Sequence, residues 1–163
     1  KNGYLFERFQ PKDSIIKDIM DIHYSLSDRQ GRPMSNAYLD KKQVFEWMRD
    51  KQVLYGVFDQ YNKLKAYAYV FVIGDLCNIS RLLGHKESLN DGVMYLLISG
   101  VVNEMVKKKI SSDYPKWIMY DTFFGAQKGL KYFKERLGFK PYKEAVGKYP
   151  SNKCKFIKYS HQG

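Results

Sequence analysis

The chain has 163 residues, a length typical of one domain, and 44% of them are apolar, which excludes an intrinsically disordered protein. The formal net charge of +11 favours anionic partners, such as a phosphorylated cofactor or a nucleic acid. Cys77 and Cys154 lie far apart and have no metal-ligand spacing, so no metal site is expected. No apolar run reaches the roughly 20 residues of a membrane span, and no signal peptide is evident. We therefore expect a cytoplasmic protein.

The first half of the chain predicts a strand, two helices and then three further strands. The expected strands are 4–9, 52–59, 64–73 and 76–83; one helix opens at Pro11 and Asp13, a polar loop covers 30–36, and a second helix covers 41–51. The apolar residues of the first helix are spaced 4, 3 and 4, at Ile15, Ile19, Ile22 and Leu26, and so share one face. The strand 64–73 is apolar on both sides, which favours a central place in a sheet.

The second half predicts a loop, a long helix, and then alternating strands and a helix. The loop is 84–92, the helices are 93–109 and 126–137, and the strands are 117–124, 139–148 and 153–159. The helix 93–109 is apolar nearly all round, so we expect it to be mostly buried. Gly138 follows the next helix where a left-handed cap is expected. We predict one mixed α/β domain over residues 1–163.

The order β-α-α-β-β-β-α-β-α-β-β resembles that of the GNAT superfamily of N-acetyltransferases. Its motifs resemble the Fem-type aminoacyl transferases and related single-domain acyltransferases, through Ser80-Arg81, Gly92 to Ile98, Tyr120 to Gly125, Gly129 to Lys134 and Leu137-Gly138-Phe139. The resemblance implies a mostly antiparallel sheet with helices on both faces. It also implies that one parallel strand pair splays apart, and that acyl-CoA lies in the resulting notch.

The resemblance implies a set of residues for acyl-CoA (acetyl-CoA or another). They are Leu82, Leu83, Asn90, Asp91, Gly92, Val93, Phe124, Gln127 and Lys128. The sequence departs from the family at the pyrophosphate loop, because the usual Q/R-x-x-G-x-G/A pattern is absent and Glu87 and Asp91 are anionic. Asn90 or Asp91 is alternatively the N-cap of the helix that follows.

Three side chains are candidates for catalysis: Lys134, His85 and Tyr132. Lys134 could bind phosphate or stabilise an oxyanion, or be a solvated helix residue. His85 suits a general base by its ordinary pKa, and the alternative is a histidine on a surface loop. Tyr132, with Tyr120, is a phenol that could return a proton to a leaving thiolate.

Two further titratable side chains, His23 and Asp121, lie in the predicted elements, and Asp121 is also a candidate for the general base. His23 lies on the first predicted helix, on its Ile16 and Met20 flank, and we expect it to be structural. Asp121 sits among apolar residues and needs a partner, for which Arg81 is the candidate; such a pair is as consistent with structure as with function.

The leading hypothesis is an N-acyltransferase that transfers an acetyl or aminoacyl group from acyl-CoA to an amine of a small molecule, peptide or sugar. The charge and the Fem-like motifs leave open a donor that is an aminoacyl-tRNA, or a nucleic-acid-modifying enzyme on the same fold. The missing pyrophosphate pattern leaves open a catalytically degenerate fold that serves as a binding module.

Overall fold

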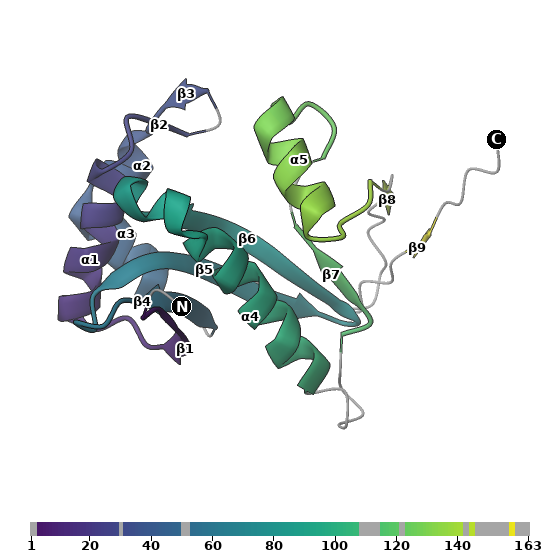
Figure 1. Ribbon diagram of the computed structural model, residues 1–163, viewed down its shortest axis with the longest axis horizontal. Coiled ribbons are helices and arrows are strands. Elements are labelled where there is room, and N and C mark those ends of the chain that lie inside the picture. The colour runs from purple at the N-terminus through teal and green to yellow at the C-terminus, as the bar shows by residue number, and fades with distance from the viewer. Residues whose placement is uncertain are drawn as a thin grey trace.

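A computed structural model describes residues 3–29, 31–49, 53–107, 115–120 and 123–141, together with the backbone of 144–145 and 157–158. At its centre is a five-stranded sheet in the order β1-β4-β5-β6-β7 (Figure 1). The strands are β1 (Leu5–Phe9), β4 (Leu54–Phe58), β5 (Leu64–Ile73), β6 (Leu76–Gly84) and β7 (Trp117–Met119). Neighbouring strands are antiparallel except β6 and β7, which are parallel. The predicted sheet type is confirmed.

Helices cover both faces of this sheet (Figure 1). One face carries α1 (Asp13–Tyr24), α2 (Asn36–Leu39) and α3 (Lys41–Arg49), and the other carries α4 (Val93–Lys107). The two faces of β5 enter separate clusters, with Ala66, Ala68 and Val70 toward α4 and with Leu64 and Tyr67 toward α1 and α3. The central, doubly buried position predicted for this strand is confirmed.

The buried stripe of α1 differs from the predicted one. Ile16, Ile19, Met20 and His23 follow the spacing of a helix face and are fully or nearly fully buried, as is Ile22. Ile15 is only partly buried, and Leu26 lies beyond the end of the helix. The prediction followed one of two overlapping apolar stripes, and the sheet covers the stripe that includes His23.

The polar loop predicted over 30–36 contains regular structure. A hairpin of β2 (Asp28–Arg29) and β3 (Arg32–Pro33) turns at Gly31, whose φ of +76° favours glycine. α2 begins at Asn36, and α3 then buries Val44 and Met48. Elements this short have too few residues to show a periodic pattern.

The segment between β6 and α4 also holds more structure than the predicted loop, a 3₁₀-helix η1 (Lys86–Asp91). α4 begins at Val93 as predicted, but it is not buried all round, because Tyr95 and Val106 are 40% and 52% exposed.

β7 and the helix that follows it, α5, are shorter than predicted. The strand predicted over 117–124 extends only from Trp117 to Met119, and α5 covers Lys128–Arg136. Gly138 has a φ of +81°, which confirms the left-handed cap. β8 (Glu144–Ala145) and β9 (Ile157–Lys158) pair with each other, and Cys154 lies outside the described residues.

Candidate functional site

The parallel strands β6 and β7 are joined at only three positions. The pairs are Leu76–Trp117, Cys77–Ile118 and Asn78–Met119. Beyond Asn78, β6 continues to Gly84 beside β5, and Figure 1 shows β7 leading away toward α5. Within the described part of the chain, no other strand pairs with this stretch of β6. The predicted splaying of the two strands is confirmed, and it begins at Ile79.

The backbone of β6 points alternately toward β5 and toward this unpaired edge. The N–H of His85 donates a 2.7 Å hydrogen bond to the carbonyl of Lys65, which sets the phase of the antiparallel ladder. Leu83 therefore bonds toward β5, whereas the N–H groups of Leu82 and Gly84 face the unpaired edge. Of the two backbone donors expected from the sequence, Leu82 and Leu83, the geometry favours Leu82.

A β-bulge at Ser80 changes which residues of β6 share a face. The register joins Asn78 to Phe71 and Arg81 to Tyr69, so Ser80 has no residue opposite it. In a regular strand, residues three apart point to opposite faces. The bulge instead brings Asn78 and Arg81 to the same face, the one that α1, α2 and α3 cover.

The guanidinium of Arg81 lies against two aromatic rings of these helices. It is 3.7 Å from the centre of the Trp47 ring and 4.7 Å from that of Tyr38. The Nη1 atom of Arg81 and the Oδ1 atom of Asn78 are both buried, and neither has a hydrogen-bond partner among the described residues. Asp121, the partner expected for Arg81, lies outside the described residues. Sequence reasoning missed that Asn78 and Arg81 share a face, and only a signal for the bulge could have revealed it.

The start of α4 lies at the far end of the unpaired edge. Gly92, with a φ of +80°, precedes the helix, and its carbonyl accepts the N–H of Leu96 at 3.1 Å. The carboxylate of Asp91 accepts a 2.7 Å hydrogen bond from the hydroxyl of Tyr4, and this bond raises the pKa of Tyr4. The expected N-cap, Asn90 or Asp91, is therefore wrong, because Gly92 occupies that position. The first turn, from Val93, contains no acidic residue.

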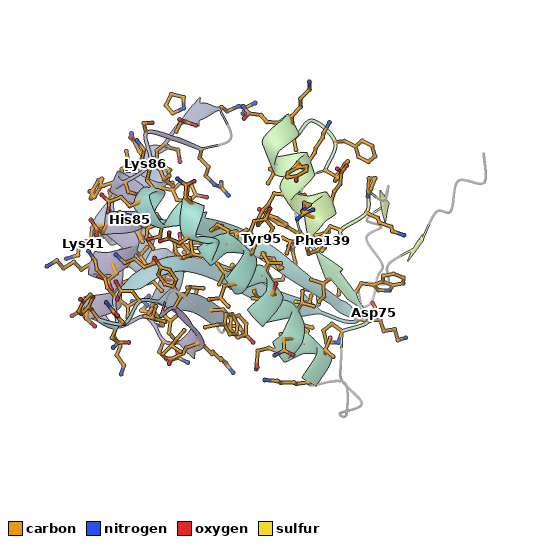
Figure 2. All side chains as sticks on the ribbon, viewed as in Figure 1. Lys41, Asp75, His85, Lys86, Tyr95 and Phe139 are labelled. Carbon is orange, nitrogen blue, oxygen red and sulfur yellow. The ribbon has the colours of Figure 1, made fainter. Side chains whose placement is uncertain are left out.

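His85 caps η1. Its Nδ1 accepts the N–H of Glu87 at 3.4 Å, and its Nε2 lies 3.9 Å from a carboxylate oxygen of Asp21. The side chain is 12% exposed and lies in the loop before η1, so its role as a general base stays a prediction. Figure 2 shows His85 and Lys86 beside α1, and Tyr95 near the middle of the view, toward α5.

Lys134 is buried in the contact between α5 and the end of β7. Only 1% of the residue is exposed. Its ammonium donates a 2.8 Å hydrogen bond to the carbonyl of Tyr120 and lies 4.3 Å from the centre of the Tyr120 ring. The alternative of a solvated helix residue is therefore wrong.

The remaining predicted residues lie around the start and outer face of α5. Tyr132 is 60% exposed and its ring lies 6.0 Å from the guanidinium of Arg136; Phe124 is 54% exposed, and Lys128 is exposed. The amide of Gln127 lies so close to Gly31 that a Cβ at Gly31 would overlap it. The start of α5 and the β2–β3 hairpin therefore meet across the site.

Two classes of site find no support in the described ranges. No group of three or more His, Cys, Asp or Glu residues there could hold a metal ion. In the same ranges, every helix is too short or too polar to cross a bilayer.

The chain is similar in structure to acetyltransferases of low sequence identity. A protein from Clostridium difficile described as a possible acetyltransferase matches with a TM-score of 0.67 and 15% identity, over 90% of this chain and 98% of that one. The ribosomal-protein-S18-alanine N-acetyltransferase of Escherichia coli matches with a TM-score of 0.61 and 13% identity, over 93% and 88%. An acetyltransferase of Trypanosoma brucei matches with a TM-score of 0.58 and 13% identity, over 89% and 99%.

Comparisons of sequence gave no such match. No family model matches the chain, and neither does a curated protein. Together with the splayed β6–β7 pair, the structural matches show that the chain has the fold of the GNAT acetyltransferases.

Proposed function

We propose that the protein is an N-acyltransferase that moves an acyl group from acyl-CoA to an amine. The observation that carries the proposal is the unpaired edge of β6, which leads from the divergence at Ile79 to the start of α4. The names of the similar structures support acetyl as the group transferred.

The unpaired edge suits the pantetheine arm of the donor. That arm is extended and contains two amides, so it can pair with the N–H groups of Leu82 and Gly84 as an added strand does. The pyrophosphate would then reach the start of α4, where unpaired N–H groups and the helix dipole favour an anion. The left-handed Gly92 and the absence of acidic residues in the first turn support this orientation.

The reaction needs few groups from the protein. The amine nitrogen attacks the thioester carbonyl carbon, the new C–N bond forms, and the C–S bond breaks. The amine loses a proton, and the leaving thiolate gains one. The N–H of Leu82 faces the position where the carbonyl oxygen would gain negative charge, which supports a role as oxyanion donor.

The candidate side chains take different places along this path. His85 lies six residues beyond Ile79, about 20 Å along a strand, so we place it at the phosphate end and not beside the amine. Tyr120 follows β7 directly at the divergence, whereas Tyr132 points outward, so Tyr120 is the better proton donor to the thiolate. Lys134, bonded to the Tyr120 carbonyl, is a positioning residue.

Aminoacyl-tRNA remains the alternative donor. The net charge of +11 favours a nucleic-acid ligand, and a tRNA complex would weaken steeply with salt. An aminoacyl-tRNA would also place its ester at the unpaired edge, but it would not need the start of α4 for a pyrophosphate. Binding of acetyl-CoA and of tRNA, each titrated at two salt concentrations, separates the two donors.

The sharpest test is nuclear magnetic resonance of the labelled protein with acetyl-CoA. We expect the amide signals of Leu82, Gly84 and Val93 to shift, and that of Leu83, which bonds toward β5, to move least. Release of free thiol on addition of an amine then measures transfer. If acetyl-CoA shifts none of these amides, the acyl-CoA proposal is wrong. Binding of tRNA alone would then support the alternative donor. If neither acetyl-CoA nor tRNA binds, the result supports a binding module.

A further inference from the structure

Two buried polar atoms on β6 lack the partners that their chemistry requires. The Nη1 of Arg81 is a donor that carries positive charge, and the Oδ1 of Asn78 is an acceptor. An unpaired buried donor or acceptor is unfavourable, so proteins rarely keep one without a reason. Both residues are only partly buried as a whole, but the two atoms themselves are covered, so a ligand would have to displace the side chains over them.

The two atoms belong to neighbouring positions on one face. Because of the bulge at Ser80, Asn78 and Arg81 stand opposite Phe71 and Tyr69, which are two residues apart on β5. Neighbouring side chains on one strand face start about 7 Å apart. That spacing suits a small molecule that holds an anion and an amine a few bonds from each other.

A second cation reinforces the positive charge at this place. The guanidinium of Arg29, on the β2–β3 hairpin, lies 5.1 Å from the centre of the Tyr38 ring that Arg81 also contacts. Within the described residues, no carboxylate forms an ion pair with either arginine. Burial, with smaller contributions from both guanidinium groups, lowers the pKa of His23 to about 4. An anion is the partner that this arrangement lacks.

His23 holds the segment of Tyr38, whose ring contacts Arg81. His23 bonds to the carbonyl of Tyr38 at 2.6 Å through Nδ1 and to the hydroxyl of Tyr67 at 2.7 Å through Nε2. Since a carbonyl only accepts, Nδ1 carries the proton and Nε2 accepts from Tyr67. Trp47 and Tyr38 then limit the motion of the Arg81 guanidinium, and a guanidinium held in a fixed plane is suited to a carboxylate.

The site lies next to the proposed reaction centre and on the opposite side of the sheet from α4. Arg81 is adjacent to Leu82, whose N–H faces the unpaired edge, and Asn78 is the last residue of β6 that pairs with β7. A ligand held by both would therefore reach the thioester from the face covered by α1, α2 and α3, whereas the donor phosphates lie at α4.

We propose that Asn78 and Arg81 bind the acceptor of the reaction, and that this acceptor is an amino acid. Arg81, assisted by Arg29, receives the carboxylate, and Asn78 accepts a hydrogen bond from the amine and directs it toward the thioester. The role of the amino acid as acceptor rests on the proposed function, whereas the binding site itself does not depend on transfer.

The test uses the full chain with the twenty common amino acids, each at millimolar concentration, with and without CoA. For the tightest binder, the matched probes are the amine that lacks its carboxylate and the acid that lacks its amine. We expect side-chain signals of Arg81 and Asn78 to shift with the amino acid, and both matched probes to bind about ten- to a hundredfold more weakly.

Three variants separate binding from folding. Arg81→Met removes the charge but keeps an apolar side chain against Trp47 and Tyr38, so it should leave the melting temperature nearly unchanged while abolishing amino-acid binding. Arg81→Lys keeps the positive charge but lacks the two parallel N–H donors of a guanidinium, so it should restore only part of the amino-acid binding. Arg136→Met, which removes an exposed arginine that also lies against a tyrosine ring, should change neither property.

The outcomes distinguish the two proposals. If acetyl-CoA binds and its acetyl group is transferred equally well to amines without a carboxylate, the acceptor site is wrong and the transferase proposal stands. The same holds if no amino acid shifts the side-chain signals of Arg81. If an amino acid binds at Arg81 but acetyl-CoA does not bind, the site stands and the transferase proposal is wrong. A fall in melting temperature of Arg81→Met alone would mark a structural arginine and overturn the site.

Discussion

The ammonium of Lys134 and the backbone carbonyl of Tyr120 are joined by a buried hydrogen bond of 2.8 Å. Tyr120 is the first residue after β7, at the point where that strand has left β6. The bond therefore anchors the diverging chain to α5. Because the same ammonium lies over the Tyr120 ring, one side chain fixes both the backbone and the ring at the edge of the proposed acyl site.

Lys134→Met should destabilise the protein by about 1–3 kcal/mol, because the apolar stem remains but the Tyr120 carbonyl loses its donor. Chemical unfolding measures the change. Transfer should also fall, through a loss of order at β7 that appears as broadened amide signals on both sides of Tyr120.

Arg136→Met is the matched control for Lys134→Met, since it removes an exposed cation from the same helix and should change the unfolding free energy little. If Lys134→Met keeps its stability but loses transfer completely, the positioning role is wrong and Lys134 takes part in the reaction directly.

His23 predicts a specific pH dependence of stability. Burial lowers its pKa to about 4 from an ordinary 6.5, so between these values the unfolded chain binds a proton that the folded chain does not. The unfolding free energy should therefore be highest above pH 6.5 and fall by roughly 3 kcal/mol as the pH decreases to about 4. Denaturant unfolding at a series of pH values gives this slope.

His23→Asn should flatten the slope in that window, because the titrating ring is gone. The carboxyls with lowered pKa values, Asp21, Asp40 and Asp59, act at lower pH, since their contribution is lost below their ordinary value of 3.8. A slope between pH 6.5 and 4 that survives in His23→Asn would show that other groups cause it.

The fold could be predicted largely because burial has a period. The apolar residues on both faces of β5 and the helical spacing in α1 and α5 are visible in the sequence, and so is the order of the elements. The length of β7 is different. The run WIMYDTFF stays apolar beyond Met119, yet Tyr120 packs on Phe133 and Phe139 and not in a strand pair. Burial without strand pairing looks the same in sequence as burial with it.

The site could be predicted only in part, because it depends on register and on unexpected burial. A one-residue bulge at Ser80 places Asn78 and Arg81 on the same face, and the residue types at this position do not predict a bulge. Lys134 is one of several cations on α5, so its burial follows from where β7 ends and not from local pattern. The backbone donors of Leu82 and Gly84 carry no side-chain signature at all.

Asp91→Asn should strengthen binding of acetyl-CoA about two- to fivefold. The carboxylate lies two residues before α4, where it opposes a pyrophosphate, and its removal takes away one repulsive charge. Isothermal titration should show this gain at low salt and a smaller one at high salt.

Tyr4→Phe is the control for Asp91→Asn, because it removes the same hydrogen bond without changing the charge. It should leave the affinity for acetyl-CoA nearly unchanged. If Tyr4→Phe reproduces the gain, the position of the loop and not its charge limits binding; if neither variant has an effect, the phosphates do not lie at the start of α4.

Gly31→Ala should weaken both stability and amino-acid binding, because two effects coincide at this position. The φ of +76° strains any residue with a Cβ, by about 1 kcal/mol, and the new methyl group would overlap the amide of Gln127. The hairpin carries Arg29, so a displaced hairpin should raise the KM for the amino acid more than it lowers kcat. Adding Gln127→Ala should remove the overlap but not the strain, so the double variant should recover part of the loss. Strict additivity of the two changes would mean that the hairpin and α5 do not touch in solution. The Gly31–Gln127 contact would then not hold the hairpin, and with it Arg29, against the start of α5.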